Sequence, residues 1–270
     1  MKPAPFDYLR AETLAEAHAA LATEGSDAAV IAGGQSLVPL LSMRMARPKL
    51  VVDIMRIAGL GDIAVQDDAI RVGAAVRQAA LLAWPELGAR QPLLAQALPW
   101  VGHWQTRARG TVCGSLALAD PSAELPLCLL ALGGSVVLSS ASGRRSVAAD
   151  DFFTGLMSTA RRDDELIEAA SFPCRRAGTG YAFGEFARRH GDFAIVACAA
   201  VATGKSVRLA VGGVADRPAL GEFDEPSDDG LDAFAAELEA RDDLHATADY
   251  RRQLVRRLGR KTIEEARCRV

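Results

Sequence analysis

A short apolar run followed by two adjacent glycines constrains this chain more than any other feature. Residues 28 to 31 have the length and composition of a buried strand, and the glycines then begin a small-residue loop over residues 33 to 36. Residues 37 to 43 predict a helical turn. The amides of such a loop can approach a ligand closely, because no Cβ atom stands in the way. The pattern favours a phosphate site, and an ordinary Gly-Gly turn explains these residues equally well by themselves.

The usual dinucleotide-binding fingerprint does not fit this loop. Its glycines do not follow the GxGxxG spacing, and Asp53 at the end of the next strand-like run is not at the position of the ribose-binding acid. A Rossmann fold is therefore disfavoured.

Before the loop, Thr13 and Glu16 form a capping box that predicts a helix over residues 13 to 24.

Composition narrows the classes of protein. The chain has 270 residues, of which 50% are hydrophobic and 24% charged, with a formal net charge of -3. We therefore expect a soluble protein of several subdomains that binds no nucleic acid. The first residues lack the apolar region of a signal peptide, and no apolar run approaches the roughly 18 residues that span a bilayer, so we expect a cytoplasmic protein without membrane insertion. Five cysteines without a CxxC pair and four scattered histidines predict no metal site.

A second polar segment, residues 102 to 121, interrupts an apolar region. It contains two arginines, glycines, small hydroxyl residues and an Asp-Pro step, and neither helical nor strand periodicity fits it. We therefore expect a loop with an exposed backbone. Its amides need hydrogen-bond partners, which a bound polar cofactor would supply.

Several stretches together resemble the FAD-binding medium subunit of the molybdenum hydroxylases. That family includes carbon monoxide dehydrogenase and the flavin domain of xanthine dehydrogenase. The stretches are residues 32–36, 109–115 and 119–126, with residues 1–20 and 189–196 in support. Two separated loops with matching ends are more specific than either loop alone.

The resemblance implies an α+β fold with a two-lobed FAD-binding domain of the vanillyl-alcohol-oxidase (PCMH) type. A small C-terminal domain with a three-stranded antiparallel sheet and helices would follow. We place the two lobes at residues 1–57 and 58–175 and the C-terminal domain at residues 176–270. Strand-like runs at residues 182–186, 194–201 and 207–211 would form the C-terminal sheet.

The resemblance also implies that the two loops hold the FAD pyrophosphate from opposite sides, mainly through backbone amides. The implied cofactor-binding residues are Ala32, Gly33, Gly34, Gln35, Ser36, Leu37, Thr111, Cys113, Gly114, Ser115, Asp120, Leu166, Arg189 and Phe193. Asp120 would hold a ribityl or ribose hydroxyl, with a helix N-cap as its alternative role. Leu166 would lie near the adenine or flavin edge, or simply in the core. Arg189 and Phe193 would lie near the isoalloxazine, or in a basic surface turn.

Cys113 departs from the family pattern, which commonly has glycine at this position. Cysteine does not readily adopt a positive φ, so either the backbone there is ordinary or the loop is reshaped. The thiol is then either a redox-sensitive group beside the cofactor or a packed and inert side chain.

The function implied by the resemblance is that of an FAD-carrying electron-transfer subunit. It would accept single electrons from [2Fe-2S] clusters and pass pairs to an external acceptor, with no catalytic side chain of its own. The chain lacks the cysteine sets for such clusters. We therefore expect a large molybdopterin subunit and a small [2Fe-2S] subunit as partners in a dimer of heterotrimers. A stand-alone FAD oxidase or dehydrogenase with its own organic substrate, and a non-catalytic nucleotide-binding or scaffold protein, are the alternatives.

Overall fold

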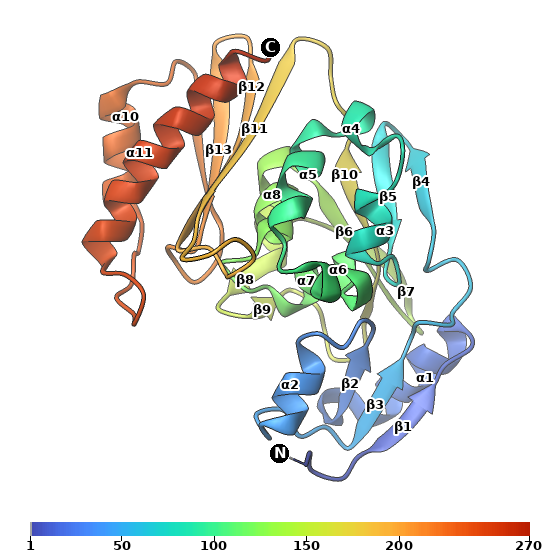
Figure 1. Ribbon diagram of the computed structural model, residues 1–270. Helices are drawn as coiled ribbons and strands as arrows, with labels where there is room; N and C mark the ends of the chain where they lie inside the picture. The colour runs from blue at the N-terminus through green and yellow to red at the C-terminus, as the bar shows by residue number, and fades with distance from the viewer. Residues whose placement is uncertain (1) are drawn as a thin grey trace.

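The computed structural model describes residues 2–270, and the chain forms three successive groups of strands and helices (Figure 1). The first group is a parallel sheet in the order β1-β3-β2, and its helices are α1, η1 and α2. Its strands are β1 (Asp7–Arg10), β2 (Ala28–Ile31) and β3 (Leu50–Asp53). Its helices are α1 (Leu14–Glu24), η1 (Gly25–Asp27) and α2 (Leu37–Ser42). The predicted strand and helical turn on either side of the glycine loop are thus confirmed.

The second group is an antiparallel sheet in the order β4-β5-β10-β6-β7, with a block of short helices packed against it (Figure 1). Its strands are β4 (Ile63–Gln66), β5 (Ala69–Gly73), β6 (Ser135–Ser140), β7 (Gly143–Ala148) and β10 (Leu166–Pro173). The helices are α3 (Gln78–Leu82), α4 (Leu87–Arg90), α5 (Pro92–Ala97), η2 (Leu98–Trp100), α6 (Trp104–Arg109), α7 (Val112–Leu118), α8 (Glu124–Leu132) and α9 (Ala149–Phe152). A small ribbon, β8 (Phe153–Gly155) with β9 (Ser158–Thr159), follows α9.

The second polar segment is not the open loop that its composition predicted. It folds into α6 and α7, separated only by Gly110 and Thr111. The side chain of Thr111 caps α7 by accepting a hydrogen bond from the amide of Gly114 at 3.0 Å. Helices of six or seven residues depend on tertiary contacts, and α7 has buried Val112 and Leu116 for this, whereas α6 has no buried residue. Their periodicity is too short to recognise in the sequence.

The third group corrects the predicted number of strands in the C-terminal sheet. The sheet has four antiparallel strands, in the order β11-β12-β13-β14, instead of three. They are β11 (Thr179–Phe186), β12 (Val196–Thr203), β13 (Ser206–Gly212) and β14 (Ala219–Phe223). β14 contains Gly221 and Glu222, which have low strand propensity, and it is held by pairing with β13 at the sheet edge.

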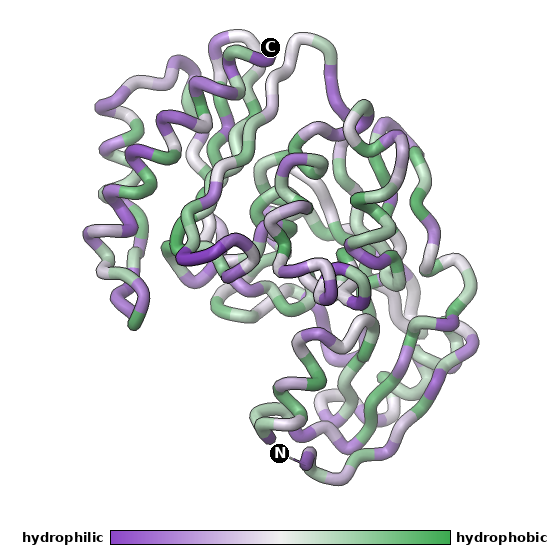
Figure 2. Tube along the Cα trace, in the orientation of Figure 1, coloured by the Kyte–Doolittle hydropathy of each residue, from purple (hydrophilic) through white to green (hydrophobic). Residues whose placement is uncertain are grey.

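Two apolar cores lie on opposite faces of the C-terminal sheet. One extends from α1 through the second group to Tyr181 and Phe183 on β11. The other lies between this sheet and the helices α10 (Asp228–Glu237) and α11 (Ala248–Arg267), and it includes Ala182. Figure 2 shows polar and apolar residues alternating along α11, as expected for a helix with one buried face. The domain boundaries given above stay a prediction. Within residues 2–270 no helix combines the length and apolar character needed to cross a membrane.

Candidate functional site

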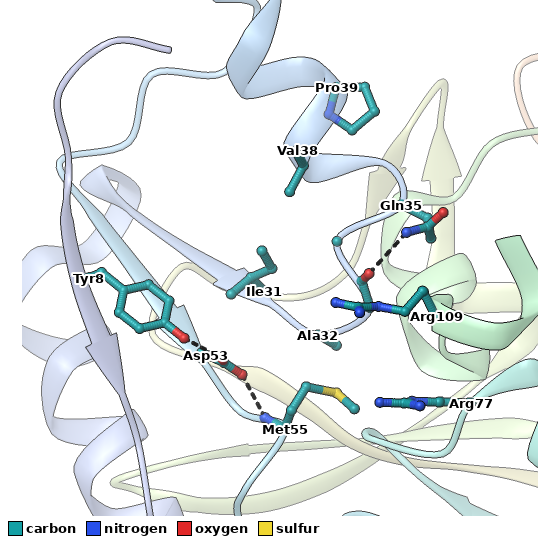
Figure 3. A pocket seen from close by; sticks show the side chains of 12 residues that line it. Tyr8, Ile31, Ala32, Gln35, Val38, Pro39, Asp53, Met55, Arg77 and Arg109 are labelled. Atoms are coloured by element: carbon teal, nitrogen blue, oxygen red, sulfur yellow. Dashed lines mark hydrogen bonds between the residues drawn. The ribbon is translucent and has the colours of Figure 1, made fainter. Parts of the chain in front are cut away.

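A pocket of about 620 Å³ lies beside the glycine loop, at the edge of the first sheet where its three parallel strands end (Figure 3). The carboxyl ends of parallel strands are a common place for ligand sites. The lining residues are Tyr8, Ile31, Ala32, Gly33, Gly34, Gln35, Val38, Pro39, Asp53, Met55, Arg77 and Arg109. Four of the predicted cofactor-binding residues, Ala32 to Gln35, are therefore part of this pocket.

The glycine loop presents a row of free backbone donors. Within residues 2–270 the amides of Gly33, Gly34, Gln35, Ser36 and Leu37 donate to no acceptor. The hydroxyl of Ser36, at the N-cap of α2, likewise makes no capping bond. Gly34 has φ +71°, which favours glycine at this position. Consecutive unused amides of this kind suit an anionic ligand.

The structure brings the two predicted loops into direct contact. A Cβ atom built on Gly33 would lie 2.1 Å from the carbonyl oxygen of Arg109 and 2.7 Å from the Cα atom of Gly110. Only glycine allows the first loop to approach the end of α6 this closely. The two segments named from the sequence thus form one wall of the pocket.

Residues 76–78 hold the second segment in place, a role that was not evident from the sequence. Arg77 forms an isolated antiparallel bridge with Thr111. The amide of Gln78 donates to the carbonyl of Gly110 at 2.8 Å, and Val112 donates to Val76 at 3.0 Å. The buried Gln78 side chain contacts the Thr111 carbonyl, while its Oε1 has no partner among the described residues. These bonds fix the link between α6 and α7.

Two arginines and one aspartate give the pocket its charge. The side chains of Arg77 and Arg109 point into it (Figure 3), and neither forms a salt bridge with any residue of 2–270. At the other end, the Tyr8 hydroxyl donates to the Asp53 carboxylate, which also accepts from the Met55 amide at 2.9 Å. The sequence did not identify either arginine as a lining residue of this pocket. It also gave no reason to assign Asp53 as a ribose ligand.

The remaining predicted residues of the second segment lie outside the pocket lining. Thr111 is buried and its hydroxyl caps α7, whereas Gly114 and Ser115 on α7 are partly exposed. Cys113 lies within α7 with an ordinary helical backbone, so no positive φ is required there. Its side chain is 2% exposed, and burial raises the pKa of the thiol to about 12. These features describe a packed cysteine.

Asp120 lies in the turn between α7 and α8. Its carboxylate accepts a hydrogen bond from the amide of Ser122 at 2.9 Å, and burial raises its pKa. The N-cap of α8 is Ala123, so the alternative role of Asp120 as a helix cap is wrong. Close by, burial raises the pKa of Glu124 to about 7, and burial together with the charge of Glu124 raises that of Glu185 to about 8.

The other three predicted residues lie on β10 and on the loop between β11 and β12. Leu166 is fully buried in β10. Arg189 pairs with Asp192 at 3.0 Å, and the Phe193 side chain is 63% exposed. Their loop packs against the start of α6, where a Cβ atom on Gly191 would lie 2.5 Å from Nδ1 of His103. The loop therefore adjoins the second segment without lining the pocket.

Comparison with known proteins gives consistent matches over the whole chain. Residues 4–175 match the family described as the FAD binding domain in molybdopterin dehydrogenase. The 6-hydroxypseudooxynicotine dehydrogenase complex subunit alpha of Paenarthrobacter nicotinovorans is 38% identical, covering 98% of this chain and 96% of the relative. The nicotine 6-hydroxylase medium subunit of the same organism is 37% identical, covering 100% of both.

A solved structure agrees with these sequence matches. Reconstituted CO dehydrogenase from Oligotropha carboxidovorans superposes with a TM-score of 0.94 at 31% identity, covering 100% of both chains. The predicted family resemblance, the α+β fold class and FAD as the cofactor are thereby confirmed. The chain belongs to the family of FAD-binding medium subunits of the molybdenum hydroxylases and is a component of an oxidoreductase.

Proposed function

We propose that this chain is the FAD-carrying electron-transfer subunit of a multi-subunit molybdenum hydroxylase. Electrons arrive singly from [2Fe-2S] clusters of a partner subunit and leave in pairs to an external acceptor. Bound FAD supplies the redox chemistry, because a flavin accepts electrons one at a time and releases them two at a time. The observation that carries the proposal is the contact of Gly33 with Arg109 and Gly110, which joins both predicted cofactor loops at one pocket.

The residues of the pocket fit a dinucleotide cofactor. The free amides of Gly33, Gly34 and Gln35 in the pocket lining match a pyrophosphate. The carboxylate of Asp53 in the lining, and that of Asp120 outside it, are suited to accept hydrogen bonds from sugar hydroxyls. In this proposal the residues of the chain bind and orient the cofactor, and none of them acts as a general acid or base.

We also propose the composition of the complex. A large molybdopterin subunit oxidises the substrate, a small [2Fe-2S] subunit connects it to this chain, and two such heterotrimers associate. Relatives named as a complex subunit and a medium subunit, matched over nearly their full length, support this arrangement. Purification of the tagged chain from its native host tests it by the co-purifying polypeptides and by molybdenum and iron analysis. Recovery of the chain alone, without either metal, contradicts the proposed composition.

The cofactor site is tested by the FAD content of purified variants. We expect the wild-type chain to be yellow and the Asp120→Ala and Gly34→Val variants to lose FAD. Valine at residue 34 must adopt φ +71° and meets Val38 Cγ2 at 3.2 Å. Gly61→Ala is the control, because no atom lies within 4 Å of its Cβ position. Wild-type FAD content in both site variants would show that the assignment is wrong, and reduction of the isolated chain by an organic substrate would favour the stand-alone oxidase.

A further inference from the structure

We infer that Arg77 and Arg109 bind the two phosphate groups of the cofactor, so that fixed positive charge contributes to its affinity in addition to backbone amides. The inference rests on the proposed function and assigns a cofactor-binding role to Arg77, which lies outside both loop motifs, and to Arg109, which was not among the predicted cofactor-binding residues. It also identifies the part of the ligand that they recognise. The ligand class is a dinucleotide with a diphosphate bridge.

The first reason is that both guanidinium groups are unused. Arg107 lies on the same helix, and its Nη1 donates to the carbonyls of Pro99, Val101 and Gly102 at 3.3, 2.9 and 2.7 Å. Arg109 makes no side-chain hydrogen bond or ion pair within residues 2–270, and the same is true of Arg77. Arg107 therefore has a structural role, whereas the other two guanidinium groups are available to a ligand.

The second reason is that the backbone fixes both arginines beside the free amides. Arg77 is bridged to Thr111, and the carbonyl of Arg109 lies against Gly33. Each arginine thus starts from a rigid part of the pocket wall. Their side chains extend toward the glycine loop and Met55 (Figure 3).

The third reason is that the pocket offers the arginines no internal counter-ion. Asp53 is the only acidic residue in its lining. The Asp53 carboxylate already accepts hydrogen bonds from Tyr8 and from the Met55 amide. Two guanidinium groups and the free amides of the lining residues Gly33, Gly34 and Gln35 therefore surround a space that suits negative charge. Two adjacent phosphates meet this need, since guanidinium groups bind phosphate oxygens in pairs.

The experiment measures nucleotide binding to the full-length chain after removal of flavin. FAD is titrated directly, and ADP is used as a competitor that carries the diphosphate without the flavin. Arg77→Gln and Arg109→Gln are compared with Arg257→Gln, which removes an exposed, unpaired charge on α11. We expect each pocket variant to weaken both FAD and ADP by about tenfold to hundredfold. Arg257→Gln should bind like the wild type.

Lysine variants separate charge from geometry. Arg109→Lys should recover part of the affinity, because lysine restores the charge but not the two-pronged hydrogen bonding. Added salt should weaken FAD binding to the wild type more than to the double glutamine variant. Unfolding midpoints establish that each variant is folded. If a glutamine variant does not fold, the corresponding lysine variant is used in its place.

Three results overturn the inference or its basis, and they can be distinguished. Unchanged FAD affinity in both glutamine variants overturns the inference and leaves the proposed function standing. Weakened FAD with unchanged ADP also overturns it, because the arginines then contact the flavin half. A wild-type chain that binds no FAD at all refutes the proposed function itself.

Discussion

Replacing Gly33 by alanine tests whether close contact between the two loops builds the cofactor pocket. The new Cβ atom would lie 2.1 Å from the Arg109 carbonyl oxygen, 2.7 Å from Gly110 Cα and 2.8 Å from the Arg109 carbonyl carbon. Real Cβ atoms keep at least 3.0 Å from such neighbours, and all three are backbone atoms that cannot rotate away. The loops must therefore separate by about 1 Å, which moves the row of free amides away from Arg109.

The size of the effect follows from this displacement. Overpacking of this kind costs about 1–3 kcal/mol. For a chain of this size the unfolding midpoint should fall by roughly 3 to 10 °C. FAD should bind about tenfold or more weakly, since a loss of about 1.4 kcal/mol is a factor of ten. The assay is FAD per chain from the visible absorbance, together with unfolding midpoints measured with and without added FAD.

The matched control is Gly61→Ala. Its Cβ has open space and its φ is not positive, so this variant should keep the wild-type midpoint and FAD content. The stabilisation by added FAD should shrink in Gly33→Ala and stay intact in Gly61→Ala. A Gly33→Ala chain with wild-type FAD affinity would refute the reasoning, because the contact of the loops would then have no bearing on the pocket.

Two further predictions concern titratable groups. Burial raises the pKa of Glu185 to about 8 from 4.5, so the folded chain retains a proton that the unfolded chain loses; stability should fall as pH rises from about 4.5 to 8. Glu185→Gln should remove this part of the slope in unfolding midpoints measured from pH 5 to 9, and an unchanged slope would contradict the raised pKa. Cys113 should resist alkylation in the folded chain while exposed Cys268 reacts, because a buried thiol with a pKa of about 12 forms almost no thiolate. Mass spectrometry after brief treatment with iodoacetamide distinguishes the two sites, and early modification of Cys113 would contradict its packing.

The parts of the fold that could be predicted are those encoded in contiguous residues. The strand Ala28–Ile31, the glycines after it and the turn at α2 follow one another in sequence, so their local pattern was sufficient. The edge strand β14 and the short helices α6 and α7 could not be predicted. Their local signals are weak. β14 depends on pairing with β13, α7 on side chains packed into the core, and α6 on the hydrogen bonds of Arg107 to three carbonyls outside it.

The cationic side of the pocket shows why the full site could not be predicted. Arg107 and Arg109 are the same residue type two positions apart, and the sequence does not distinguish them. Because an α-helix turns by about 200° over two residues, their side chains point in nearly opposite directions. One therefore reaches three carbonyls and the other reaches the pocket. Arg77 is remote from Arg109 in sequence, and its bridge to Thr111 brings it to the same pocket. A net charge of -3 gave no sign of a cationic site, because affinity for phosphate depends on which charges the fold leaves unpaired at one place.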